Sequence, residues 1–301
     1  MTRIAVLLIA LAAMAVGRAD EDHADGVVAE ILGRIACVKA VQPNAVPMAF
    51  WDFDGTIIWA DATLGSKRMA PYFTGLMESA ILAGLNNIYS GSEGWHRYFD
   101  DDRLRLRDLA QWMAVPFRAQ MYEGRSVAEM ESFAAAKFEN ELSRYYFRSS
   151  IRILKALQAA GVENHIISGS PDVFVRAAAE SLGVPRANLH GVRVAEVEGK
   201  LTVQLLYPLP VEVGKIELMD AIVKSCPHGV VVAGFGNDYR TDGPFLRAIA
   251  TRTLPGGAKG FSLMINGRQY DSAYDGLFRC VKQAELVGTC RGDGQSSVHY
   301  Q

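Results

Sequence analysis

The stretch from Pro47 to Trp59, PMAFWDFDGTIIW, constrains the fold more than any other part of the chain. Its apolar beginning is typical of a short buried strand that ends where Asp52 starts a polar turn. Because residues two apart in a strand face the same side, Asp52 and Asp54 are predicted to point into one site. That site lies at the carboxyl end of the strand, where open α/β sheets bind their ligands.

Two carboxylates held close together repel each other, and a divalent cation offsets that repulsion. Oxygen ligands suit Mg²⁺, so Mg²⁺ is the cofactor that this pair favours. Gly55 permits a sharp turn after the pair, and Thr56 adds a hydroxyl group beside the site. Asp and Gly are also common turn residues, so the motif alone does not separate a metal site from a plain turn.

A second polar turn follows the predicted strand Glu163–Ile167 and reads Ser168-Gly169-Ser170-Pro171. A strand, a turn of small residues and a helix that opens with proline form a good anion site. Backbone N–H groups and the hydroxyl of Ser168 are predicted to hold phosphate oxygens there. A simple turn with Ser170 as the helix N-cap explains the same residues equally well.

Two further stretches carry charge at the ends of predicted elements. Lys215 stands in the first turn of a helix that runs to about Lys224, where a cation opposes the helix dipole. An anionic site facing Lys215 would explain this placement, and an ordinary surface lysine is the alternative. The buried strand Gly229–Gly234 is followed by a loop, Asn237–Asp242, whose carboxylates are positioned to complete a metal site.

Taken together, these four stretches resemble the motifs of the haloacid dehalogenase superfamily. Asp52-Phe-Asp54-Gly-Thr56 is similar to its first motif, Ser168 to its second, Lys215 to its third and Asn237–Asp242 to its fourth. The resemblance covers roughly residues 47–265. It implies an α/β fold, with a Rossmann-like parallel-sheet core and a helical cap inserted after the first motif.

The resemblance also implies roles for single residues. Asp52 attacks phosphorus and becomes an aspartyl phosphate, and Asp54 protonates the leaving alkoxide and then activates water. The implied phosphate-binding residues are Thr56, Ser168, Gly169 and Lys215. The implied ligands of Mg²⁺ are Asp52, Asp54 through its carbonyl, and Asp238, with Asn237 and Asp242 in supporting positions.

The fourth motif departs from the family pattern, because Asn237 follows Gly236 where the family commonly has aspartate. We prefer Asp238 as the metal ligand, since its four-residue spacing to Asp242 matches the commonest form. In the longer form of the loop Asn237 takes that place, and its neutral amide binds Mg²⁺ more weakly.

The substrate is expected to be a small phosphorylated metabolite, similar to phosphocholine or phosphoserine. The helical insert resembles the cap of the phosphoserine phosphatase-like branch. The loop ending in Asp242-Gly-Pro-Phe-Leu246 resembles that of bacterial phosphorylcholine phosphatases, and an aromatic-rich cap suits a quaternary ammonium group. The alternatives are a phosphotransferase that uses the same aspartyl phosphate and a catalytically silent binding protein.

The chain is expected to divide into four parts. Residues 1–19 read as a cleaved signal peptide, with Arg3, an apolar run and a cleavage site after Ala19. Residues 20–60 and 149–290 are assigned to the core, 61–148 to the helical cap and 291–301 to a mobile tail. Helices are predicted around residues 26–39 and after Ser126, which begins a capping box with Glu129.

A signal peptide implies export to the periplasm or the medium, where disulfides form. The four cysteines allow three pairings, of which Cys280 with Cys290 is the local option and leaves Cys37 with Cys226. Buried free thiols are the alternative. The net charge of −2 and the absence of a basic block give no reason to expect nucleic acid, or a membrane after signal cleavage, as a partner. The oligomeric state stays open.

Overall fold

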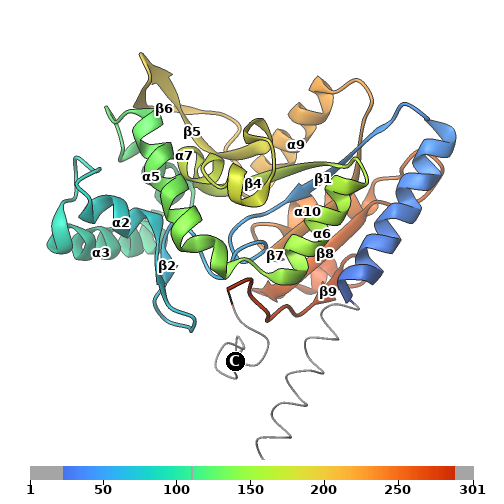
Figure 1. Ribbon diagram of the computed structural model, residues 1–301, viewed down its shortest axis with the longest axis horizontal. Helices are drawn as coiled ribbons and strands as arrows, with labels where there is room; N and C mark the ends of the chain where they lie inside the picture. Colours follow the sequence, from blue (N-terminus) through green and yellow to red (C-terminus); the bar gives the residue numbers. More distant parts are fainter. Residues whose placement is uncertain (1–22, 110, 289–301) are drawn as a thin grey trace, which may run out of the picture.

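The computed structural model describes residues 23–109 and 111–288. Its centre is a seven-stranded sheet in the order β6-β5-β4-β1-β7-β8-β9 (Figure 1). Neighbouring strands run parallel except for β5 and β6, which are antiparallel. The strands are β1 (Val46–Trp51), β4 (Glu163–Pro171), β5 (Leu189–Val197), β6 (Lys200–Leu206), β7 (Gly229–Asp238), β8 (Phe261–Arg268) and β9 (Arg279–Val281).

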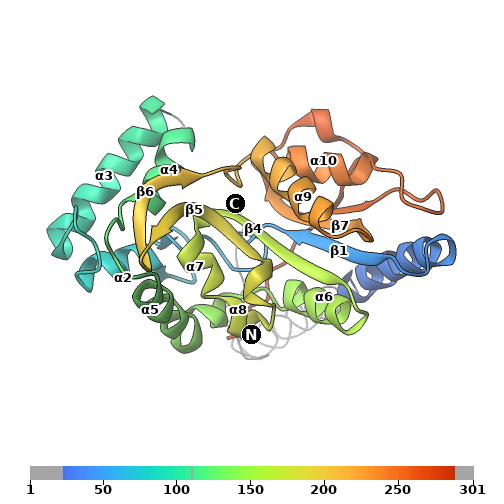
Figure 2. The same cartoon turned by 90° about the horizontal axis from the view of Figure 1, so that it is seen from above.

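Helices cover both faces of this sheet, as the α/β class requires. One face carries the helix over residues 23–41 together with α6 (Arg148–Ala159), α7 (Asp172–Arg176) and α8 (Ala179–Leu182). The other carries α9 (Val213–Ser225) and α10 (Gly243–Thr251) (Figure 2). Two short 3₁₀ turns, η2 (Arg186–Asn188) and η3 (Ser272–Tyr274), complete this part of the fold.

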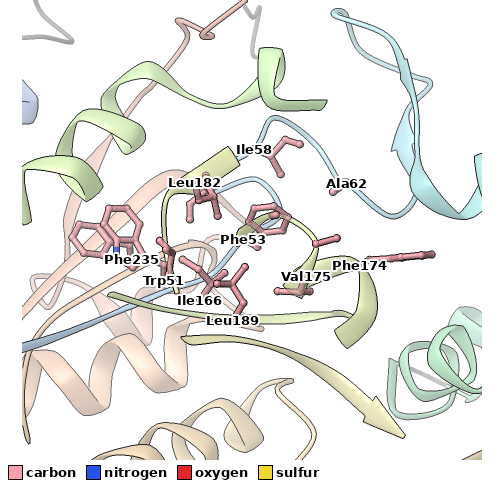
Figure 3. Packing of buried hydrophobic residues seen from close by; sticks show 14 of the residues in the cluster. Trp51, Phe53, Ile58, Ala62, Ile166, Phe174, Val175, Leu182, Leu189 and Phe235 are labelled. Carbon is pink, nitrogen blue, oxygen red and sulfur yellow. The ribbon is translucent and has the colours of Figure 1, made fainter. Parts of the chain in front are cut away.

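Strand β1 lies in the middle of the sheet because nearly all of its side chains are apolar and buried. Trp51 stacks on Phe235 of β7, with 3.6 Å between ring centroids (Figure 3). Its indole N–H donates to Asn164 Oδ1 at 2.8 Å, so the polar end of the ring has a partner. Phe53 packs on Phe138 and Tyr146, which anchors the turn after β1 in the core.

The inserted segment between β1 and α6 is mainly helical and forms one side of the molecule (Figures 1 and 2). It contains β2 (Gly65–Ser66), β3 (Phe73–Thr74), α2 (Leu76–Leu82), α3 (Gly91–Leu109), α4 (Gln111–Gln120), α5 (Val127–Asn140) and η1 (Leu142–Tyr145). Tyr89, Tyr98 and Tyr122 are buried in its core. The division at residues 61 and 148 stays a prediction.

Local patterns in the sequence gave several elements correctly. Ser126 caps α5 by accepting a hydrogen bond from the N–H of Glu129, as the capping box predicts. The hairpin of β5 and β6 turns at Glu198 and Gly199, which both have positive φ, the signature of a tight two-residue hairpin. Strands β4 and β7 run four residues further than the apolar runs indicate, into the polar turns that follow them.

Of the pairings that the sequence left open, the one that joins Cys37 to Cys226 is wrong, because both are free thiols. They belong to elements on opposite faces of the sheet: Cys37 lies in the helix over residues 23–41, and Cys226 packs with the cluster under α9 and α10. Cys280 is a free thiol as well. Its predicted partner Cys290 lies outside the described residues.

The predicted signal peptide at residues 1–19 and the tail at 291–301 also lie outside the described residues. Within residues 23–109 and 111–288, none of the helices combines the length and the apolar character needed to cross a membrane.

Candidate active site

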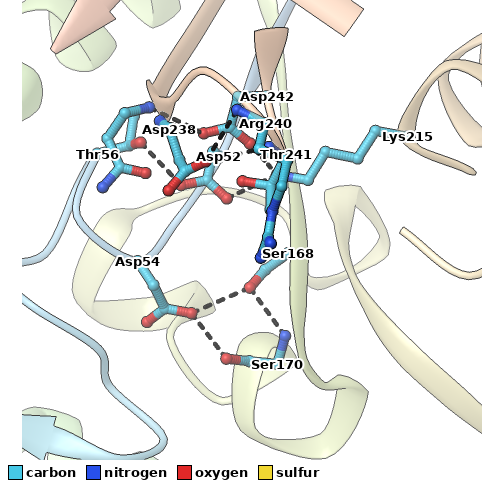
Figure 4. A network of polar contacts seen from close by, with 11 residues as sticks. Asp52, Asp54, Thr56, Ser168, Ser170, Lys215, Asp238, Arg240, Thr241 and Asp242 are labelled. Carbon is cyan, nitrogen blue, oxygen red and sulfur yellow. Dashed lines mark hydrogen bonds and ion pairs between the residues drawn. The ribbon is translucent and has the colours of Figure 1, made fainter. Parts of the chain in front are cut away.

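Asp52 stands directly after the central strand, so the sheet fixes its backbone. The N–H of Asp52 donates to the carbonyl of Phe235 at 2.8 Å, which continues the pairing of β1 with β7. The side chain of Asp52 is buried and both its oxygens accept hydrogen bonds (Figure 4). Lys215 Nζ donates to Oδ1 at 2.7 Å, and Thr56 Oγ1 donates to Oδ2 at 2.8 Å.

Lys215 joins two buried carboxylates. Its Nζ lies 2.7 Å from Oδ1 of Asp52 and 2.7 Å from Oδ1 of Asp242. Burial by itself lowers the pKa of Lys215, but the two carboxylates outweigh burial and raise the pKa above its usual range. The unfavourable position of Lys215 in the first turn of α9 is therefore explained by the anionic site that it faces.

A close contact of the backbone sets the start of α9. A Cβ atom at Gly214 would lie only 1.8 Å from the carbonyl oxygen of Leu209, so no other residue fits there without movement. Asp242 is held from the other side, because its Oδ2 accepts the N–H groups of Asn237 and Asp238 at 2.9 and 3.0 Å. Backbone contacts thus set the positions of both Lys215 and the carboxylate of Asp242.

The pKa of Asp52 is raised to about 7. Burial is the main cause and the charge of Asp242 adds to it, while Lys215 and the hydrogen bond from Thr56 oppose both. The carboxylate of Asp52 accepts a charge-assisted hydrogen bond from Lys215 and lies at the polar edge of the sheet. In this position it is able to act as a nucleophile.

Asp54 lies in different surroundings. Its Oδ1 accepts the N–H of Ala62 at 2.7 Å, and its Oδ2 accepts the hydroxyl groups of Ser168 at 3.1 Å and Ser170 at 2.7 Å (Figure 4). The residue as a whole is partly exposed, whereas protein atoms surround its carboxyl group. Burial, followed by the charges of Asp61 and Asp52, raises the pKa of Asp54 to about 8.

The turn that carries Ser168 differs in detail from the prediction. Strand β4 continues through Pro171, and α7 begins at Asp172 with no side-chain cap, so Ser170 is not an N-cap. The N–H of Ser170 donates to Ser168 Oγ at 3.1 Å. A Cβ atom at Gly169 would lie 3.8 Å from Val115 of α4, so the inserted segment lies against this turn.

The side chains of Asn237 and Asp238, both in the fourth motif, have different neighbours. A Cβ atom at Gly55 would lie 1.9 Å from Asn237 Nδ2, so the amide of Asn237 lies against the turn that holds Asp52 and Asp54. Gly55 has a φ of +81°, which favours glycine at this contact. Asp238 instead turns its Oδ1 to the N–H groups of Arg240 and Thr241, at 2.9 and 3.2 Å.

Within the described ranges, no group of three or more His, Cys, Asp or Glu side chains is arranged to hold a metal ion. A site built from Asp52, the carbonyl oxygen of Asp54 and Asp238 contains two such side chains. With Asn237 in place of Asp238 it contains one. Neither arrangement therefore requires a group of three. All of these donors are oxygen atoms, which fit Mg²⁺ and do not favour a soft metal.

Three residues at Asp54 were not predicted: Ala62, Thr63 and Ser170. Ala62 donates its backbone N–H to the carboxyl group, Ser170 donates its hydroxyl, and Thr63 Oγ1 donates to Ser170 Oγ at 2.9 Å. Only the small-residue turn Ser168–Ser170 carried a signal for Ser170. Ala62 and Thr63 lie in a loop whose path the sequence pattern does not define.

One cavity among the described residues lies away from these side chains. A cavity of about 620 Å³ opens at the opposite edge of the sheet, where β1 and β7 begin. Its lining includes Asn44, His228, Arg252 and Leu254. Parallel strands bind ligands at their carboxyl ends, so we assign the chemistry to the edge with Asp52 and not to this cavity.

Comparison with known proteins extends these findings. The sequence pattern of the haloacid dehalogenase-like hydrolases matches residues 49–247. No curated protein matches the chain. Among solved structures, a protein of unknown function from Bordetella pertussis Tohama I is similar, with a TM-score of 0.55 and 13% identity over 75% of this chain and 92% of that one. At this identity the likeness shows the fold alone.

Two other solved structures are less similar. A haloacid dehalogenase family hydrolase from Salmonella enterica serovar Typhi has a TM-score of 0.48 and 12% identity, over 80% of this chain and 69% of that one. A phosphoserine phosphohydrolase-like protein from Francisella tularensis SCHU S4 has a TM-score of 0.44 and 15% identity, over 73% and 87%. The family pattern spans most of the chain and includes all four predicted motifs. The chain therefore belongs to the haloacid dehalogenase-like hydrolases.

Proposed function

We propose that the chain is a phosphomonoester hydrolase that works through an aspartyl phosphate on Asp52. The observation that carries this proposal is the division of two neighbouring carboxylates between different surroundings. Asp52 is paired with the cation of Lys215, while Asp54 is held by hydroxyl and amide donors. When two neighbouring carboxyl groups have such different surroundings, one is able to act as the nucleophile and the other as the acid.

The first chemical step uses both groups. An oxygen of Asp52 bonds to phosphorus as the bond from phosphorus to the leaving oxygen breaks. Asp54 gives its proton to that oxygen, and its raised pKa keeps the proton available near neutral pH. In the second step water attacks the aspartyl phosphate, and Asp54 takes up a proton from that water.

Lys215, Ser168 and Thr56 are proposed to stabilise the transferring group. Lys215 already contacts the attacking carboxylate, so its charge lies beside the position where phosphate oxygens gather negative charge. The hydroxyl group of Ser168 lies next to Asp54, on the leaving-group side of the site. Gly169, in the same turn, is proposed to offer its backbone N–H to phosphate.

Mg²⁺ is proposed as the cofactor. Asp52, the carbonyl of Asp54 and either Asn237 or Asp238 would hold it, and it would supply positive charge to neutralise the phosphate. The contact between Asn237 and Gly55 supports Asn237, while the carboxylate of Asp238 gives the stronger ligand type. The choice between them is tested below.

The substrate is proposed to be a small phosphorylated metabolite, similar to phosphocholine or phosphoserine. The loop residues 242–246 and the aromatic cap support phosphocholine. We also propose that residues 1–19 direct export to the periplasm or the medium. Sequencing the amino terminus of protein recovered from those fractions tests export, and a chain that still begins at Met1 contradicts it.

The test of the function is phosphate release from a panel of esters, with Mg²⁺ or EDTA. The panel contains phosphocholine, phosphoethanolamine, phosphoserine and p-nitrophenyl phosphate. Mg²⁺-dependent release with one preferred ester supports the proposal and names the substrate. Release from no ester contradicts it. Added acceptor alcohol separates hydrolysis from transfer, because a phosphotransferase diverts the phosphoryl group from water to the alcohol.

A further inference from the structure

A chain of buried hydroxyl groups links the inserted segment to Asp54. Thr63 Oγ1 donates to Ser170 Oγ at 2.9 Å, and Ser170 Oγ donates to Asp54 Oδ2 at 2.7 Å. Thr63 is 1% exposed and Ser170 is 6% exposed, so bulk water does not compete for these bonds.

The two hydroxyl groups form a chain with a direction. Each carries a single proton, and Thr63 gives its proton to Ser170. The oxygen of Ser170 is therefore already an acceptor, and its own proton is directed at Asp54. Removing either hydroxyl group breaks the same chain, so the two residues are expected to act on Asp54 as one unit.

The backbone holds both ends of this chain. The N–H of Thr63 donates to Asp61 Oδ1 at 2.8 Å, and its carbonyl accepts the N–H of Met77 in α2 at 3.0 Å. On the other side, a Cβ atom at Gly191 of β5 would lie 2.5 Å from the carbonyl oxygen of Ser170. Such close packing leaves Ser170 little freedom to move.

We propose that Ser170 and Thr63 are positioning residues that orient the carboxyl group of Asp54 toward the leaving-group oxygen. This inference rests on the proposed function. The proton moves from Asp54 to the leaving oxygen as that oxygen takes the electron pair of its bond to phosphorus. A carboxyl group that has lost its orientation delivers the proton less effectively, while phosphate binding at Ser168 and Lys215 is unaffected.

The test compares two esters that differ in their need for an acid. A glycerol phosphate releases a strongly basic alkoxide that must be protonated, whereas p-nitrophenyl phosphate releases a weakly basic phenolate that leaves unaided. The quantity measured is kcat/KM, because it covers only the steps up to departure of the leaving group. Ser170→Ala is expected to lower kcat/KM for the glycerol phosphate by roughly 10- to 100-fold and to leave p-nitrophenyl phosphate unchanged.

Matched variants at Thr63 supply the control. Thr63→Val keeps the shape but loses the hydroxyl group, and it is expected to show the same ester-dependent loss to a smaller degree. Thr63→Ser keeps the hydroxyl group and is expected to restore kcat/KM to the wild-type value. Thermal unfolding of each variant checks the fold, and the Thr63 pair decides the question if Ser170→Ala does not fold.

Each remaining outcome overturns a stated claim. An equal loss for both esters, or no loss for either, overturns the positioning role and leaves the proposed function in place. Wild-type protein that releases phosphate from neither ester overturns the proposed function, and the positioning role falls with it.

Discussion

Asp52 and Asp54 are two residues apart in the chain, yet their polar surroundings have opposite characters. Asp52 belongs to a cluster of charges, with Lys215 bridging it to Asp242. Within the described part of the chain, the hydrogen bonds to the carboxyl group of Asp54 come from neutral donors, namely two hydroxyl groups and a backbone N–H. A cation stabilises the ionised form of a carboxyl group, whereas burial and neighbouring negative charges stabilise its neutral form.

One short turn gives two neighbouring carboxyl groups different surroundings. The turn after β1 sends one carboxyl group toward α9 and the fourth motif, and the other toward the Ser168 turn and the inserted segment. The charged region, formed by Asp52, Lys215 and Asp242, belongs wholly to the core of the fold. The neutral region is shared with the insert, through Ala62 and Thr63.

The largest effect is expected from removing the carboxylate in the charged region. Asp52→Asn removes the nucleophile and is expected to lower kcat by on the order of 10⁴-fold or more, with the fold retained. Phosphate release gives the rate, and circular dichroism checks the fold. Asp220→Asn, on the exposed face of α9, is the matched control and keeps wild-type activity. Wild-type activity in Asp52→Asn contradicts the mechanism.

The insert holds a buried ion pair that can be compared with the charged pair at Asp52. Arg118 contacts both oxygens of Asp102 at 3.1 and 2.8 Å, and Tyr98 donates to the same carboxylate. Arg118→Met leaves that carboxylate buried without its cation and is expected to cost about 3–5 kcal/mol of unfolding free energy.

Urea unfolding measures this loss, and Asp102→Leu combined with Arg118→Met is expected to recover most of it. The exposed Arg107→Met, in the preceding helix, is the control and leaves the unfolding midpoint unchanged. An unchanged midpoint in Arg118→Met would show that the pair contributes nothing to folding.

Removing the cation of the charged region is expected to impair both phosphate affinity and rate. Lys215→Ala deprives the transferring phosphate of one fixed positive charge and is expected to lower kcat/KM by roughly 10²-fold. Lys224→Ala, in the last turn of the same helix, is the control. Unchanged kinetics in Lys215→Ala would remove this residue from the site.

Exchanging the fourth-motif residues tests which of them binds Mg²⁺. If Asn237 is the ligand, Asn237→Asp adds a negative charge and is expected to tighten Mg²⁺ binding about 10-fold. Titration calorimetry with MgCl₂ measures the affinity without any substrate. A loss of Mg²⁺ binding in Asp238→Asn, with no gain in Asn237→Asp, assigns the ligand to Asp238 instead.

The two surroundings also predict the pH dependence. Asp52 must be ionised to attack, so kcat/KM rises as pH increases through its pKa of about 7. Asp54 must carry its proton, so kcat/KM falls as pH increases through about 8. A narrow bell-shaped profile is expected, and Mg²⁺ shifts its acidic limb to lower pH. A rate that keeps rising well above the pKa of Asp54 contradicts its role as the acid.

Much of the framework followed from the sequence. The apolar run before Asp52 predicted the central strand. The polar edge of the sheet was predicted from residues at the ends of other predicted elements, namely Ser168, Lys215 and Asp242. These inferences succeed because burial and strand or helix period are local properties of the chain. The expectation of disulfides failed for Cys37, Cys226 and Cys280, because a count of cysteines does not say on which face of the sheet each lies.

The amino-acid sequence was therefore sufficient to identify the family, the central strand and the residues at the carboxyl edge of the sheet. The three-dimensional packing was needed to show how the two carboxylates divide their partners, that Asn237 contacts Gly55, and that Thr63 is linked to Asp54 through Ser170. The reason is physical: Thr63 and Ser170 are 107 residues apart and meet through the packing of the insert on the core. No periodic pattern within either segment specifies that contact.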